Sequence, residues 1–330
     1  MQPRRYSNSV DSIVLIRPPE QSTPKKRNVR NDGRVARILA MIVLMVAGAC
    51  CATTVSAQVP PLLQPTNPET HIGKIIFTEL ITPDLNMAKQ FYGGLFGWTF
   101  QTTKVGDSDY AQAFMNGYPV AGLIQKTLSN TENRQSAWLT FISTGDVDAT
   151  KTIALKHGAK LLSEPRNVPN RGRQAVFADP QGAVFAILAS TSGDPADSLA
   201  EPGEWIWSSL ISSDPDNGAG FYQTLFNYEI FELPAPAGEE HLLFASKSYA
   251  RASANSLPSN GLNHHSHWLN YARVVDATAM TAKVVALGGH ILLEPRTDRH
   301  GGKVAIVSDP AGAPFGLLEW LGNDMKETPK

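Results

Sequence analysis

The chain has 330 residues, a formal net charge of -1 at pH 7 and 42% hydrophobic residues. This composition is typical of a soluble globular protein of about two domains. A nearly neutral chain without a basic stripe gives no electrostatic reason to expect DNA or RNA as a partner.

The first 57 residues predict an export signal. Residues 1–37 are polar and rich in Arg and Lys, and no charged residue follows until Glu69. An apolar stretch from Ile38 leads to Val55-Ser56-Ala57, whose small residues suit cleavage before Gln58. An uncleaved membrane anchor is the alternative, since residues 38–57 could nearly span a bilayer. Either reading places the remaining chain outside the cytoplasm, as a periplasmic, extracellular or outward-facing anchored protein.

Both cysteines, Cys50 and Cys51, lie inside this segment. Cleavage after Ala57 therefore leaves a mature chain without thiols, disulfides or thiolate metal sites. Four prolines then make residues 58–69 read as an extended linker.

The next elements alternate between strand and helix patterns. Residues 75–81 form an apolar, β-branched run that predicts a strand. Asp84 then favours a helix start, and four apolar residues at helical spacing give that helix one buried face. The glycines at 93, 94 and 97 mark its end. Strand patterns follow at 98–104, 110–115 and 119–125, and the same order recurs from Trp138 to Ala189.

The whole pattern repeats at an offset of 130 residues. The segment Phe91–Trp98 returns as Phe221–Tyr228, and Asp179–Ala183 returns as Asp309–Ala313. A constant offset over landmarks this far apart indicates a duplicated globular domain. We expect domains at 70–192 and 204–322, a linker at 193–203 and a tail at 323–330.

These segments resemble the vicinal-oxygen-chelate superfamily, which includes glyoxalase I, bleomycin-binding proteins and extradiol dioxygenases. The resemblance covers about Thr70 to Leu321 and is carried by 82–84, 91–98, 119–122, 146–149, 158–159 and 179–183. The tandem arrangement is similar to a two-domain glyoxalase-like branch. The resemblance implies an α+β fold of two tandem domains, each made of two βαβββ modules with curved mixed sheets around a cavity.

The resemblance also implies a metal site, but the matching positions are apolar. In the first copy these positions are Phe77, Trp138 or Leu139, and Ala186. In the second copy they are Trp207, Trp268 or its neighbour, and Gly316. Apolar side chains cannot coordinate a metal. We therefore expect no metal and no other cofactor, with a divalent metal as the alternative.

Two residues are candidates for catalysis. Glu79 shares a strand face with Phe77, and a carboxylate in an apolar cavity could act as a general base or bind a cationic ligand. A structural pairing of Glu79 with an arginine such as Arg173 is the alternative. His267 directly precedes Trp268 and shares a strand face with His265. His267 could therefore be a metal ligand or an acid–base group. The alternative is that residues 264–267 form a solvated loop that leads into the strand. Glu79 or Glu319 could complete such a site.

Six further residues are candidates for contacts with a ligand. Aromatic side chains suit an apolar or planar molecule, and Arg173 suits an anionic group. A role in core packing would explain the three tryptophans equally well, and Arg173 could simply be a charged residue at the surface. The candidates are Phe77, Trp138, Arg173, Trp207, His265 and Trp268.

Two functions remain open. The first is an exported protein that binds a small, partly apolar molecule in a sheet-lined cavity without a metal. The second is an atypical lyase, isomerase, hydrolase or dioxygenase-like enzyme that uses Glu79 or His267. Because two copies in one chain can pair internally, we expect a monomer or a homodimer. A membrane would be a partner only through an uncleaved N-terminal segment.

Overall fold

A computed structural model describes residues 59–126, 136–233, 241–257, 265–298 and 301–320. The predicted signal or anchor at 1–57 and the tail at 323–330 lie outside these ranges. Within the described part of the chain, no helix combines the length and apolar character needed to cross a bilayer.

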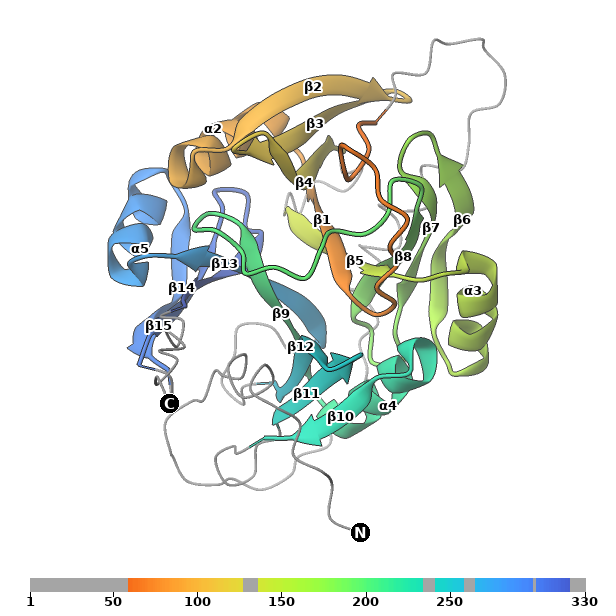
Figure 1. Ribbon diagram of the computed structural model, residues 1–330. Coiled ribbons are helices and arrows are strands. Elements are labelled where there is room, and N and C mark those ends of the chain that lie inside the picture. Colours follow the sequence, from red (N-terminus) through yellow and green to blue (C-terminus); the bar gives the residue numbers. More distant parts are fainter. Residues whose placement is uncertain (1–58, 127–135, 234–240, 258–264, 299–300, 321–330) are drawn as a thin grey trace, which may run out of the picture.

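The elements follow the predicted order in both repeats (Figure 1). The first repeat contains β1 (Ile75–Thr82), α2 (Leu85–Phe96), β2 (Thr99–Val105), β3 (Ser108–Met115), β4 (Tyr118–Gln125), β5 (Ala137–Ser143), α3 (Val147–Lys156), β6 (Lys160–Val168), β7 (Gly172–Ala178) and β8 (Val184–Ser190). The second contains β9 (Trp205–Ser212), α4 (Pro215–Phe226), β10 (Glu229–Glu232), β11 (His241–Ser246), β12 (Tyr249–Ser256), β13 (His267–Val274), α5 (Ala277–Ala286), β14 (His290–Thr297), β15 (Lys303–Ser308) and β16 (Pro314–Glu319).

Each repeat forms one curved mixed sheet of eight strands. The strand order is β2-β3-β4-β1-β5-β8-β7-β6 in the first sheet and β10-β11-β12-β9-β13-β16-β15-β14 in the second. Within each sheet, β1 pairs antiparallel with β5 and β9 with β13, which joins two βαβββ halves. The predicted α+β fold of two tandem domains is thereby confirmed.

The helices begin where the sequence predicts. The side chains of Asp84 and Asp146 accept hydrogen bonds from backbone amides in the first turns of α2 and α3, which satisfies donors that a helix start leaves free. The end of α2 differs in part from the expectation. Gly93 and Gly94 lie inside the helix, and Gly97 ends it with φ 79°, a left-handed conformation that glycine adopts without strain.

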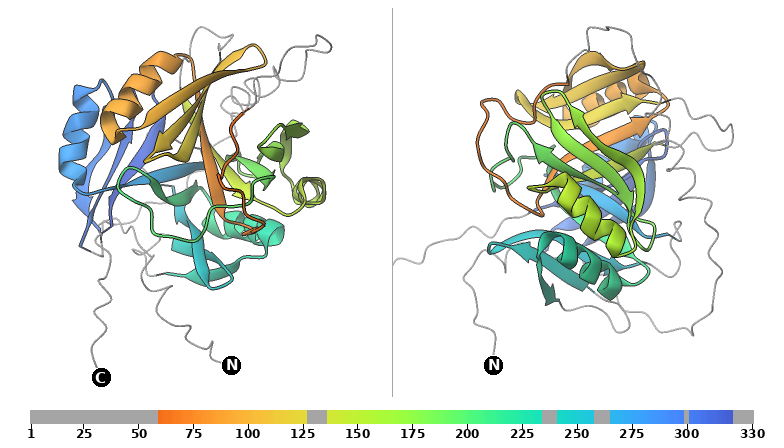
Figure 2. Two further views of the ribbon diagram at one scale, coloured as in Figure 1. Left: turned by 45° about the horizontal axis from the view of Figure 1, so that its top comes forward. Right: turned by 90° about the vertical axis from the view of Figure 1, so that its right-hand side faces the viewer.

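Helices of one repeat pack against helices of the other. Helix α2 contacts α5, and α3 contacts α4, as Figures 1 and 2 show. Two hydrophobic cores follow from this arrangement. One joins α2 and neighbouring strands to residues 272–317 of the second repeat, and the other joins the second half of repeat one to α4 and its strands.

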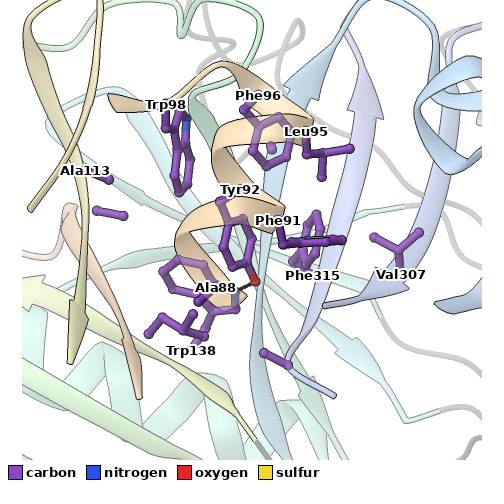
Figure 3. Packing of buried hydrophobic residues seen from close by; sticks show 14 of the residues in the cluster. Ala88, Phe91, Tyr92, Leu95, Phe96, Trp98, Ala113, Trp138, Val307 and Phe315 are labelled. Carbon is purple, nitrogen blue, oxygen red and sulfur yellow. Dashed lines mark hydrogen bonds between the residues drawn. The ribbon is translucent and has the colours of Figure 1, made fainter. Parts of the chain in front are cut away.

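A buried hydrogen-bonded chain crosses between the repeats in each core. In the first core, Trp138 Nε1 donates to Tyr92 Oη at 3.0 Å, and Tyr92 Oη donates to Asp309 Oδ2 at 3.3 Å. Figure 3 shows Tyr92 between Trp138 and Phe315, surrounded by other aromatic rings. The second core repeats the arrangement with Trp268, Tyr222 and Asp179. The repeated landmarks of the sequence are thus the residues that hold the repeats together.

Candidate functional site

The concave face of the first sheet combines apolar and charged side chains. Along β1, Leu80 belongs to the core between the repeats, whereas Phe77 packs in a separate cluster on the opposite face. Side chains alternate along a strand, so Glu79 shares the concave face with Phe77. Glu79 is half-buried there.

Arg171 reaches into this face from the turn between β6 and β7. Asn170, with φ 63°, and Gly172, with φ 126°, form the turn. A Cβ atom at residue 172 would lie 2.0 Å from Ala189 O, so only glycine fits. This tight turn directs Arg171 inward, and only 3% of the residue is exposed.

The Arg171 guanidinium is held by neutral groups. Its Nη2 donates to Gln112 Oε1 at 2.8 Å and to Tyr110 Oη at 3.1 Å. Its Cζ lies 4.1 Å from the centroid of the Phe77 ring, which is a cation–π contact. Its Nε is buried without a hydrogen-bond partner among the described residues. One charged donor therefore remains available inside the concave face.

Glu79 lies within the electrostatic influence of this guanidinium. Burial raises the pKa of the Glu79 carboxyl, while the charges of Arg171, Arg166 and Lys126 oppose the rise. In the described part of the chain, no hydrogen bond or ion pair joins Glu79 to Arg171, whose Nη2 bonds go to Gln112 and Tyr110. Both groups thus keep hydrogen-bonding capacity for a third one.

The residues after the predicted cleavage site pack onto this face. Leu62 is 3% exposed and joins the cluster around Phe77, and Val59 joins Tyr110, Ile81 and Ile124. Backbone bonds from Asn67 to Ser192 and from Asp194 to Glu69 fix the segment. The residues expected to form a linker therefore cover part of the concave face of the first repeat.

The second repeat lacks this charged pair. Ser209 occupies the place of Glu79, and its Oγ lies 2.8 Å from Ser253 Oγ. Gly301 stands at the place of Arg171 in the 130-residue offset. The Tyr271 ring lies so close to Gly316 that a Cβ there would be 1.9 Å from Tyr271 Cδ1.

The positions expected for metal ligands do not suit a metal. Phe77, Leu139 and Ala186 pack together in one apolar cluster of the first repeat, without a donor atom among them. In the second repeat Tyr271 fills the space beside Gly316. Among the residues that the structure describes, no group of three or more His, Cys, Asp or Glu side chains could hold a metal ion.

Several residues chosen from the sequence lie away from the Glu79 site. Trp138 and Trp268 belong to the cores between the repeats. Arg173 is at the surface, where its Nε lies 2.7 Å from Asp148 Oδ2. Trp207 lies on β9 of the second repeat, where its Nε1 donates to Ser253 Oγ at 3.0 Å.

The two histidines are also apart from Glu79. His265 is exposed, and His267 lies at the start of β13 in the second sheet. Burial lowers the pKa of His267, whose Nδ1 lies 2.9 Å from the carbonyl oxygen of His265. Glu319 accepts from the backbone amides of Ala277 and Lys303. The structure thus joins Phe77 and Glu79, but not His267, in one site.

Arg171 is the site residue that the sequence reading missed. The sequence does contain a sign of its role, which is a difference between the two repeats. Gly301 stands at the place of Arg171, just as Ser209 stands at the place of Glu79. Arg173 lies closer to the predicted strand, so the sequence favours it over Arg171. The direction of a side chain in a turn does not follow from strand periodicity.

Residues 71–187 match the family model of the Glyoxalase/Bleomycin resistance protein/Dioxygenase superfamily. A protein named "Putative glyoxylase CFP32" from Mycobacterium bovis is 29% identical over 257 residues, which cover 77% of this chain and 98% of the relative. "Anthracycline biosynthesis protein DauV" from a Streptomyces species is 28% identical over 262 residues, which cover 75% and 93%.

Solved structures show the same fold at low identity. A Mn(II)-bound glyoxalase from Novosphingobium aromaticivorans has a TM-score of 0.54 and 15% identity, covering 76% of this chain and 83% of that one. A variant of homoprotocatechuate 2,3-dioxygenase from B. fuscum has a TM-score of 0.52 and 14% identity, covering 78% and 74%.

Proposed function

We propose that this chain is an exported protein that binds a small, partly apolar molecule without a metal. The chain belongs to the Glyoxalase/Bleomycin resistance protein/Dioxygenase superfamily. The ligand would lie on the concave face of the first repeat. It would present an acceptor group to Arg171 and an apolar part to the surrounding cluster.

One observation carries this proposal: the buried Arg171 keeps an N–H group for which the described residues offer no partner. A buried donor without a partner costs on the order of 1–3 kcal/mol. A ligand oxygen or a bound water would remove that cost, and a ligand oxygen would place the molecule beside Glu79.

The second repeat supports a functional reading of the pair. It forms the same eight-stranded sheet with Ser209 and Gly301 in place of Glu79 and Arg171. The fold therefore does not depend on a buried charge at these positions. A group that costs stability and that the fold can omit is a candidate for binding or chemistry.

That the protein binds its ligand without a metal is also a proposal. It is based on the residues at the positions where the resemblance implies metal ligands. The first-repeat positions are packed apolar side chains, and the second-repeat position at Gly316 faces the Tyr271 ring. Neither arrangement supplies the His and carboxylate ligands that divalent metals bind in open catalytic sites.

Export and the monomeric state complete the proposal. The basic segment, the apolar stretch and Val55-Ser56-Ala57 support export. The internal pairing of the repeats through two buried cores supports a monomer, because each repeat already covers its partner's helices.

The test is to extract bound small molecules from purified mature protein and identify them by mass spectrometry. We expect a ligand in the wild type that is lost in Arg171→Met and retained in Arg173→Met, which removes a surface arginine two residues away. Metal analysis of the same samples should show no stoichiometric metal. Equal ligand recovery from both variants would contradict the site, and a tightly held metal would contradict the metal-free reading.

An enzymatic function is the second candidate, favoured by the raised pKa of Glu79. A carboxylate of this kind accepts a proton more readily near neutral pH than an exposed one. If the extracted ligand is turned over, Glu79→Gln should abolish turnover and retain binding. Retained turnover in that variant would remove Glu79 as the base.

A further inference from the structure

A pocket lies where the two repeats meet. Its volume is about 330 Å³, within the range of small-molecule sites. Its walls come from the start of β1, from the connection at residues 197–200, and from β9, β12 and the end of the second sheet. Because both repeats contribute, the pocket differs from the concave site around Glu79 and Arg171.

Aromatic side chains make up much of the lining. The lining residues include Trp205, Trp207, Trp320, Leu199 and Leu318. Trp205 also joins the aromatic rings of the first core to this pocket, because its ring lies 4.9 Å from that of Trp138. Tyr249 lies at the rim, where 45% of the residue is exposed. Flat rings gain the most contact area against such walls, so the pocket suits a planar aromatic molecule.

The charged part of the lining has more positive than negative groups. Lys74 Nζ and Arg251 Nη1 both contact Asp197 Oδ1, at 2.8 Å and 2.5 Å. Arg251 Nη2 also donates to Asp197 Oδ2 at 3.1 Å. One carboxylate thus serves two cations among the side chains that line the pocket.

The hydrogen bonds indicate which cation is available to a ligand. Lys74 Nζ directs its three N–H groups to Asp197, Pro195 O and Ala196 O, at 2.8 Å each. Arg251 uses one bond from each terminal nitrogen for Asp197, and its Nε donates to Ser246 Oγ at 2.9 Å. Each terminal nitrogen of a guanidinium carries two N–H groups, so Arg251 retains donors. Its side chain is only 2% exposed, so a ligand could reach these donors only from inside the pocket that Arg251 lines.

We propose that this junction pocket is a second binding site, and that it takes a small planar aromatic molecule with one negative charge. The ring would pack among the tryptophans, and the anionic group would accept from the remaining N–H groups of Arg251. The ligand would thereby add a negative group beside two cations that share Asp197.

The probe for this site is 2-naphthoate, with uncharged 2-naphthamide as its matched analogue. Isothermal titration calorimetry should show saturable binding of 2-naphthoate to the mature protein and at least tenfold weaker binding of the amide. Quenching of tryptophan emission should follow the same curve, because three tryptophans line the pocket.

Leu199 offers a variant that leaves the fold intact, since it is 54% exposed at the pocket. Leu199→Glu should weaken 2-naphthoate binding roughly three- to tenfold through charge repulsion, and Leu199→Lys should strengthen it. Arg171→Met should leave this binding unchanged, which separates it from the proposed site in the first repeat.

Three outcomes would overturn the proposal. They are the absence of saturable 2-naphthoate binding, equal binding of the acid and the amide, and loss of binding in Arg171→Met with no effect of Leu199→Glu. The last result would place the probe in the first repeat and leave the proposed function standing.

Discussion

Thr140 Oγ1 donates a hydrogen bond to Asn270 Oδ1 at 3.1 Å, and the two residues are 130 positions apart. They are therefore equivalent residues of the two repeats. Equivalent residues can touch each other only close to a two-fold axis. The chain is thus built as an internal dimer whose axis passes between β5 and β13, and the buried Trp-Tyr-Asp chains away from the axis occur twice.

The paired aspartates of this internal dimer predict a pH-dependent stability. Burial raises the pKa of Asp179 and of Asp309 to about 6. As the pH falls through 6 the folded state takes up these protons, whereas the unfolded chain does so only near pH 4. The wild type should therefore become more stable as the pH is lowered from 7 to 5. Relative to the double variant Asp179→Asn/Asp309→Asn, its unfolding free energy should rise by about 1 kcal/mol per aspartate over this range.

Urea unfolding followed by tryptophan fluorescence at pH 5, 6 and 7 measures this difference. Asp276→Asn is the control, because asparagine can also accept at this exposed helix start. A difference between wild type and double variant that stays constant with pH would contradict the prediction.

The space beside Gly316 predicts a second effect. Gly316→Ala would bring a Cβ within 1.9 Å of the Tyr271 ring, so we expect a loss of about 2 kcal/mol or more in unfolding free energy. Gly220→Ala in α4 is the matched control, because a Cβ there meets nothing within 4 Å. That control should gain about 0.5–1 kcal/mol in a helix interior. Equal stabilities of the two variants would show that Tyr271 moves aside freely.

These residues show how far the sequence could predict the molecule. Strand alternation, helix spacing and Asp caps are local, so the elements and the tandem fold followed from the repeat. Trp138 and Trp268 could be assigned to a cavity or a core. The internal dimer decides for the core, because the tyrosines that accept from these tryptophans donate in turn to aspartates of the other repeat. Arg171 was missed because a turn, and not a strand, sets its direction.

The N-terminal segment makes export testable. Val59 is 6% exposed and packs beside Tyr110, so cleavage after Ala57 would spare the residues of the segment that are buried in the described part of the chain. We expect the mature protein to begin at Gln58 when the full chain is expressed in a bacterium with a general secretory pathway. N-terminal sequencing of the exported fraction measures this. An N-terminus after Val59, or a chain retained intact in the membrane fraction, would contradict cleavage at this site.

The same segment should contribute to stability. Leu62→Ala removes a side chain that is 3% exposed among Phe77, Phe141 and Leu188. Large-to-small changes at such positions cost about 2–4 kcal/mol through lost burial and the cavity that remains. The neighbouring Leu63→Ala, at a partly buried position, should cost less. Thermal and urea unfolding of both variants compare them, and a Leu62→Ala protein as stable as the wild type would show that the segment is a detachable cover.

We expect that Glu79 does not stabilise the fold. Burial outweighs the nearby cations in raising the pKa of its carboxyl, so the ionised form is disfavoured in the folded state. Glu79→Gln should therefore raise the unfolding free energy at pH 7 by about 0.5–1 kcal/mol, as often occurs when a functional charge is neutralised. The gain should shrink as the pH falls, because the wild-type carboxyl then becomes neutral itself.

Glu164→Gln, at a surface ion pair with Lys151, is the control, and its unfolding free energy should stay within about 0.5 kcal/mol of that of the wild type. A Glu79→Gln protein that is less stable than wild type at pH 7 would instead make Glu79 and Arg171 a stabilising pair, and would remove the reason to look for a ligand between them.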